Sequence, residues 1–199
     1  MKIKSSFWLV IATSLFLSAC STSVERLDEQ DQVDLSGAWN DTDSQLVARE
    51  MVEDSLSRSW ISKFVQANGT DPTVIVGSVK NLSHEHINTN SFIANIEREL
   101  INSGEVQFVA SASSRQEIRD ERADQDLNAT EETRKEMGQE YGADYMMQGQ
   151  INTIIDVDGT TQVRYYQVNL ELISIKDNRK VWVGEKKIKK LVKNSKLRG

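Results

Sequence analysis

The sequence contains one cysteine, one proline and two histidines among its 199 residues. The single cysteine, Cys20, excludes a disulfide within the chain, so an exported domain must depend on its hydrophobic core. A glycine-rich phosphate loop is also absent from the sequence. The formal net charge of −6 disfavours non-specific binding to nucleic acid. Hydrophobic residues at 38% and charged residues at 27% are nevertheless typical of a soluble globular domain.

Long apolar runs are scarce, and the longest one lies near the N-terminus. The run "FWLVIATSLFL" at residues 7–17 is too short to span a bilayer as a helix and is typical of a signal-peptide core. The segment "LSAC" at residues 17–20 then resembles a bacterial lipobox. This resemblance implies removal of residues 1–19 and acylation of Cys20, with palmitate among the acyl chains. Two or more chains give stable membrane attachment. An ordinary secretory signal that ends near a cysteine is the alternative.

The residues after Cys20 predict a location and a domain boundary. Ser21 stands where inner-membrane lipoproteins of enteric bacteria usually carry Asp, which favours the outer membrane, with the protein facing the periplasm. Residues 20–33 lack apolar periodicity and are predicted to form an acidic tether. Residues 34–199 are predicted to form a single domain with a basic C-terminal tail. That tail is either a solvated end or a contact for anionic lipid or wall polymer.

Apolar periodicity predicts an alternation of helices and strands in the domain. One long helix is expected over 44–69, a second over 90–104, and two more over 113–126 and 128–143. Strands are expected over 72–79, 106–111, 144–156, 160–175 and 179–188, with hairpin turns at "VDGT" and "KDNR". The predicted fold class is therefore α/β of the α+β type: a small mixed sheet flanked by helices, with a C-terminal antiparallel meander.

Four segments carry a resemblance to a known family. They are "DLSGAWNDTDSQLVAREMVEDSL", "INSGEVQFVAS", "EYGADYMMQGQI" and "ELISIKDNRKVWVGEKKI", which occur in this order between residue 34 and about residue 191. They resemble the penicillin-binding-protein activator LpoB family of outer-membrane lipoproteins. Related small domains occur in the N-terminal domain of TolB and in CsgG-type secretion lipoproteins.

The resemblance implies a non-catalytic protein that binds a penicillin-binding protein and stimulates peptidoglycan synthesis, with no cofactor, metal or small-molecule substrate. The alternative is a structural or assembly lipoprotein of an envelope complex, such as a CsgG-like secretion pore. The best-known family members carry a long proline-rich tether. In this chain Pro72 is the only proline and the tether is short. Either the domain does not reach as far across the wall, or its partner lies nearer the outer membrane.

Two polar clusters are candidate metal sites. "NDTDS" at residues 40–44 lacks the glycine and the distal glutamate of a calcium loop, so its acidic residues are expected to cap the first helix, with Trp39 packing beside it. "SHEHI" at residues 83–87 holds both histidines but lacks a third zinc ligand beyond Glu85, so a solvated loop is expected. Neither a nucleophile elbow nor a distinct carboxylate pair indicates an enzyme.

Polar and apolar residues alternate along the last strands. An antiparallel sheet can leave one face toward water, and an amide-rich row is predicted to form that face. Aromatic residues among neutral polar groups are typical of protein-binding surfaces, although core packing and simple solvation are the alternative explanations. The candidate partner-binding residues are Gln148, Gln150, Asn152, Tyr165, Gln167, Asn169 and Trp182.

Overall fold

The computed structural model describes residues 25, 26, 28, 36–135 and 140–193. All the described helices and strands lie within the unit formed by residues 33–199. The predictions for the signal peptide at 1–19, for lipidated Cys20 and for nearly all of the tether at 20–33 concern residues outside the described ranges. Of the basic C-terminal stretch, residues 185–193 belong to the last strand of the sheet, and residues 194–199 lie outside the described ranges.

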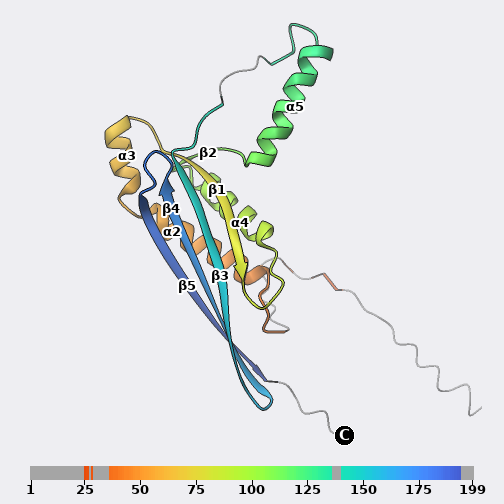
Figure 1. The fold of residues 1–199 in the computed structure, drawn as a ribbon, viewed down its shortest axis with the longest axis vertical. Coiled ribbons are helices and arrows are strands. Elements are labelled where there is room, and N and C mark those ends of the chain that lie inside the picture. The colour runs from red at the N-terminus through yellow and green to blue at the C-terminus, as the bar shows by residue number, and fades with distance from the viewer. Residues whose placement is uncertain (1–24, 27, 29–35, 136–139, 194–199) are drawn as a thin grey trace, which may run out of the picture. The chain divides into compact units, whose positions relative to one another are not determined.

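The domain is built on a mixed sheet of five strands (Figure 1). The strands are β1 (Thr73–Leu82), β2 (Gln107–Phe108), β3 (Tyr145–Asp158), β4 (Thr161–Ser174) and β5 (Lys180–Lys193). Their order is β2-β1-β3-β4-β5; β1 pairs in parallel with β2 and β3, whereas β3, β4 and β5 form an antiparallel meander. The predicted fold class is confirmed.

Helices α2 (Asp41–Leu56) and α4 (Thr89–Ser103) cover one face of this sheet (Figure 1). Both expose a polar side and bury apolar side chains against the strands, which is the usual way for a helix to stabilise a small sheet. The most completely buried members of the shared core come from α2, α4, β1, β3 and β4; they include Val47, Val74, Phe92, Ile151 and Leu172.

The start of α2 confirms the capping interpretation of "NDTDS". The Asn40 side chain accepts a 3.0 Å hydrogen bond from the Asp43 N–H, and the Asp43 carboxylate accepts one of 3.0 Å from the Asn40 N–H. This reciprocal capping box satisfies two N–H groups that a helix start otherwise leaves without a partner. Trp39 packs edge-on against Phe92 and Tyr166, as the N-terminal segment meets the core.

The long first helix predicted over 44–69 is instead two helices. α2 ends at Leu56, and α3 (Trp60–Asn68) begins after a turn of three residues. The turn lets Trp60 insert beside Tyr145 and donate a 2.8 Å hydrogen bond from Nε1 to the Ser55 carbonyl. A straight helix would not bury this indole in the same place, so tertiary packing decides against the continuous periodic pattern.

Two further predictions were wrong in part. The helix expected over 113–126 is confirmed as α5 (Ala112–Asn128), but residues 129–135 and 140–143 of the range predicted as its successor are not helical. Leu127 and Tyr141, which would have given that segment an apolar contact, are exposed. A polar segment without a face to bury has little to stabilise it as a helix. The strand expected over 106–111 is only the two residues of β2.

Candidate protein-binding face of the sheet

The face of the sheet opposite α2 and α4, here called the open face, carries the predicted amide row. Along β4, residues on the helix-covered face are buried from Tyr166 to Ser174, while their neighbours are only half-buried. The register places Asn152 beside Gln167 and Gln150 beside Asn169, so the amides of β3 and β4 form cross-strand pairs. Six of the seven candidate residues share this face: Gln148, Gln150, Asn152, Tyr165, Gln167 and Asn169.

Trp182 lies on the other face, so its predicted position among the polar residues was wrong. It is paired with Leu172 and is 6% exposed within the core. Its Nε1 donates a 2.8 Å hydrogen bond to Oδ2 of Asp54 on α2. Alternation within "KVWVG" placed an aromatic residue between two valines but did not indicate which side met the helices.

The amides are linked to charged neighbours on the same face. Gln148 donates to Glu171 at 3.0 Å, and Glu171 also forms an ion pair with Lys180 at 2.5 Å. The Lys180 contact, and then the hydrogen bond from Gln148, hold the pKa of Glu171 below its ordinary value. Gln167 donates to Glu185 on β5 at 2.5 Å. These contacts order the side chains of the open face.

An apolar group lies at the hairpin end of the open face. Ile154 is paired with Tyr165 across β3 and β4, and Lys189 lies opposite Tyr165 with its Nζ 5.7 Å from the ring centroid. Ile154 is 63% exposed, and Leu191 on β5 is 60% exposed. An aromatic ring among aliphatic side chains and amides is the composition found near the centre of many protein interfaces.

A shallow hollow of about 370 Å³ lies beside the amide row. Ser78 and Lys80 line it from β1, Gln148 and Gln150 from β3, and Glu171 from β4. The open face is therefore not flat, and a side chain of a partner could insert into this hollow.

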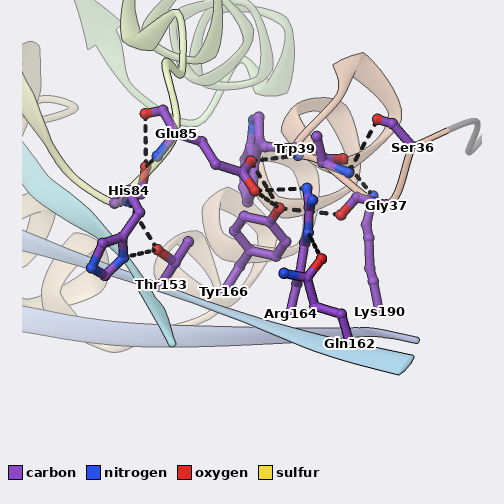
Figure 2. Close-up of polar contacts among 12 residues, drawn as sticks. Ser36, Gly37, Trp39, His84, Glu85, Thr153, Gln162, Arg164, Tyr166 and Lys190 are labelled. Atoms are coloured by element: carbon purple, nitrogen blue, oxygen red, sulfur yellow. Dashed lines mark hydrogen bonds and ion pairs between the residues drawn. The ribbon is translucent and has the colours of Figure 1, made fainter. Parts of the chain in front are cut away.

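A polar cluster around Glu85 was not anticipated from the sequence (Figure 2). Glu85 lies in the loop after β1, and its carboxylate accepts hydrogen bonds from Tyr166 at 2.8 Å, from Arg164 at 2.9 Å and from the Trp39 N–H at 3.2 Å. Burial, and next the contact with Glu85, raises the pKa of Tyr166 well above its ordinary value. The expected solvated loop is therefore right for the exposed His84 and wrong for Glu85.

The same cluster fastens the N-terminal segment of the domain. Tyr166 donates to the Gly37 carbonyl at 3.2 Å, and Lys190 donates to the Ala38 carbonyl at 3.1 Å. Lys190 also forms a 2.6 Å ion pair with Asp43, and both side chains are less than one-tenth exposed. The sequence shows each of these residues, but their contact partners lie between 46 and 152 positions away in the chain.

The described residues provide no arrangement for metal binding. Across 36–135 and 140–193, no three His, Cys, Asp or Glu side chains gather so as to hold an ion. The His84 ring instead makes a 3.1 Å hydrogen bond with the Thr153 hydroxyl. Likewise, none of the helices in these ranges combines the length and the apolar character needed to cross a bilayer.

Comparison with known proteins places the chain in a family. The profile of the peptidoglycan-synthase activator LpoB matches residues 43–188. The chain belongs to the LpoB family. No curated protein gives a significant match.

Solved structures give similar folds at low identity. The LpoB C-terminal domain from Escherichia coli is 16% identical, with 73% of this chain and 98% of that chain covered and a TM-score of 0.41. The LpoB C-terminal domain from Salmonella enterica is 18% identical, with 64% and 91% covered and a TM-score of 0.35. The lipoprotein GNA1162 from Neisseria meningitidis is 15% identical, with 62% and 86% covered and a TM-score of 0.40.

Proposed function

We propose that this protein is a non-catalytic activator that binds a penicillin-binding protein and stimulates its synthesis of peptidoglycan. The observation that carries the proposal is the match of the family profile over residues 43–188, which covers most of the sheet and nearly all of both covering helices. We further propose that lipidated Cys20 anchors the chain in the outer membrane with its domain in the periplasm.

The open face is the proposed contact surface. Its half-buried amides present donors and acceptors without a net charge, and Tyr165 supplies a rigid aromatic group near its apolar end. Such groups favour a hydrogen-bonded protein interface. Lys187 and Glu185 form an ion pair at 2.5 Å on the neighbouring strand and so place charge at the rim of this surface.

Binding alone would suffice for activation. A partner that has an active and an inactive conformation shifts toward the active one if the activator binds that conformation more tightly. A tenfold difference in affinity corresponds to about 1.4 kcal/mol, which a few well-placed contacts can supply. The activator therefore needs no catalytic group of its own.

The first test of the proposal is crosslinking in intact cells, with a photoreactive residue replacing Gln167. We expect a penicillin-binding protein in the crosslinked product. The same residue placed at Gln66, which is exposed on α3, serves as the control position and should not give this product. Recovery of secretion components alone, or purification as a large ring, would favour the assembly-protein alternative.

The second test measures stimulation by purified variants. Gln150→Arg and Gln167→Arg introduce bulk and charge on the open face without touching the core, and each is expected to weaken synthase binding by about tenfold or more. Gln66→Arg adds the same charge elsewhere and should retain full stimulation. Thermal unfolding of each variant separates loss of binding from loss of folding. If both open-face variants stimulate normally, another surface is used.

A further inference from the structure

A second and larger hollow, of about 740 Å³, adjoins the hollow of the open face, and Lys180 lines both. It is formed by α3 on one side and by the turn between β4 and β5 on the other. Its volume falls within the range of about 300–1,000 Å³ that is typical of sites for small ligands. We call it the α3 hollow; the proposed protein contact does not use it.

The apolar part of the α3 hollow is a cluster of three aromatic rings. The Tyr145 ring lies edge-on to Trp60 at 5.0 Å and to Phe64 at 5.7 Å between centroids. Trp60 is buried, and the other two are half-buried. Burial, with nearby Asp144 and Asp177, raises the pKa of Tyr145, so its hydroxyl keeps its proton. Among the hydrogen bonds of the described residues, none involves this hydroxyl, which can therefore donate to a ligand.

Cations outnumber acids around these rings. Five basic side chains line the hollow, against two acids, Asp144 and Asp177. Three of the five have acidic partners: Arg58 pairs with Asp54, Arg179 with Asp177 and Lys180 with Glu171. The other two, Lys63 and Lys176, form no ion pair within the described part of the chain.

These two lysines stand on opposite walls. Lys63 projects from α3, and Lys176 belongs to the turn after β4. A ligand with a single anionic group would reach one of them, whereas a ligand with carboxylates at separate positions would reach both. Asp177 is already paired with Arg179, but Asp144 offers in addition a place for one ammonium group. The hollow thus fits a short ligand with several carboxylates, one amine and small apolar side chains.

We propose that the α3 hollow binds the stem peptide of peptidoglycan. This peptide has the required chemistry: it is short, it carries separate carboxylates, and it ends in small alanine side chains. In the proposed contact, Lys63 and Lys176 bind two carboxylates, while the Tyr145 hydroxyl donates to a peptide carbonyl. The choice of the stem peptide as the ligand rests on the proposed function, which places the domain beside newly made peptidoglycan. An activator with such a site holds the synthase and its polymer at the same time.

The test is an NMR titration of the isotope-labelled protein with a soluble disaccharide-tetrapeptide muropeptide. We expect chemical-shift changes around Lys63, Tyr145 and Lys176, and a loss of affinity of about tenfold for each of Lys63→Gln and Lys176→Gln. Lys135→Gln is the matched control, because Lys135 is exposed but lies outside the hollow. Esterification of the muropeptide carboxylates should abolish binding.

Three outcomes would overturn the inference. They are no shifts at about 1 mM muropeptide, the weak end of measurable affinities, equal loss of affinity in Lys135→Gln, or equally tight binding of an oligoglutamate peptide. The failure of this site is distinguishable from failure of the proposed function. Gln167→Arg should lose synthase stimulation and keep muropeptide binding, whereas the variant with both Lys63→Gln and Lys176→Gln should still bind the synthase.

Discussion

The Tyr166 hydroxyl donates a 2.8 Å hydrogen bond to Glu85 Oε1, between residues 81 positions apart in the chain. The same hydroxyl reaches the Gly37 carbonyl, and the same carboxylate binds Arg164 and the Trp39 N–H. These hydrogen bonds together join β4, the loop after β1 and the N-terminal segment (Figure 2). This cluster therefore holds the residues just before α2 against the sheet.

Replacement of Tyr166 by phenylalanine tests the energetic weight of this contact. The ring stays in place against Trp39, but Glu85 loses one donor, and we expect the free energy of unfolding to fall by about 1–2 kcal/mol. Urea denaturation measures the change. Tyr165→Phe is the control, since that residue lies on the open face, and it should cost less than about 0.5 kcal/mol. Equal stabilities for the two variants would contradict this role of the hydroxyl.

The Asp43–Lys190 ion pair leads to a second prediction. Both groups are buried, so Lys190→Met leaves an uncompensated carboxylate and is expected to cost about 3–5 kcal/mol of unfolding free energy. The variant with both Asp43→Asn and Lys190→Met should cost clearly less than the sum of the single changes. Lys187→Met removes an exposed lysine and should cost clearly less than Lys190→Met. Strict additivity in the cycle would show that the pair does not interact.

The sequence predicted the elements whose signals are local. The two hairpin turns occur where "VDGT" and "KDNR" indicated them, with Gly159 and Asn178 at positive φ. The start of α2 and both ends of α4 were also approximated, because capping residues and apolar periodicity act over a few positions. Five amides and Tyr165 were correctly predicted to share one face of the sheet. Side chains alternate along each strand, so this prediction needs no knowledge of the partner strand.

The remaining features depend on contacts between distant parts of the chain. Trp60 breaks the first helix because Tyr145 provides a site for its ring, and no local pattern shows that. Trp182 faces the helices because Asp54 and the core receive it. Glu85 is a single polar residue in a polar loop, and its role depends on Tyr166 and Arg164. In each case the role of the residue depends on a contact partner that lies far away in the chain.

Close approach of strands β3 and β4 leads to a third prediction, for Gly149. A Cβ at this position would clash with the backbone carbonyl of Asn169 and with the Leu170 side chain. Gly149→Ala is therefore expected to lower the free energy of unfolding by about 1–3 kcal/mol, the usual cost of overpacking. Gly142→Ala meets open space and should be nearly neutral. Chemical denaturation of both variants checks this, and a neutral Gly149→Ala would mean that the strands separate easily.

The contact between Trp182 and Asp54 leads to a prediction about pH. The indole N–H of Trp182, and then Arg58, hold the pKa of Asp54 below its ordinary value of 3.8. A carboxylate whose pKa is lower in the folded state contributes stability that is present above the unfolded pKa. That contribution is lost as the pH falls from about 4 through the lower folded value. We expect an NMR titration to give Asp54 a pKa below 3.8 in the wild type.

The Trp182→Phe variant should raise the pKa of Asp54 toward 3.8, because the ring can still pack in the core while the donor is gone. Its unfolding free energy should consequently fall less steeply than that of the wild type as the pH drops below about 4. Trp60→Phe is the matched control, since the Trp60 N–H donates to the Ser55 carbonyl and not to Asp54. An unchanged Asp54 pKa in Trp182→Phe would assign the lowering to Arg58 instead.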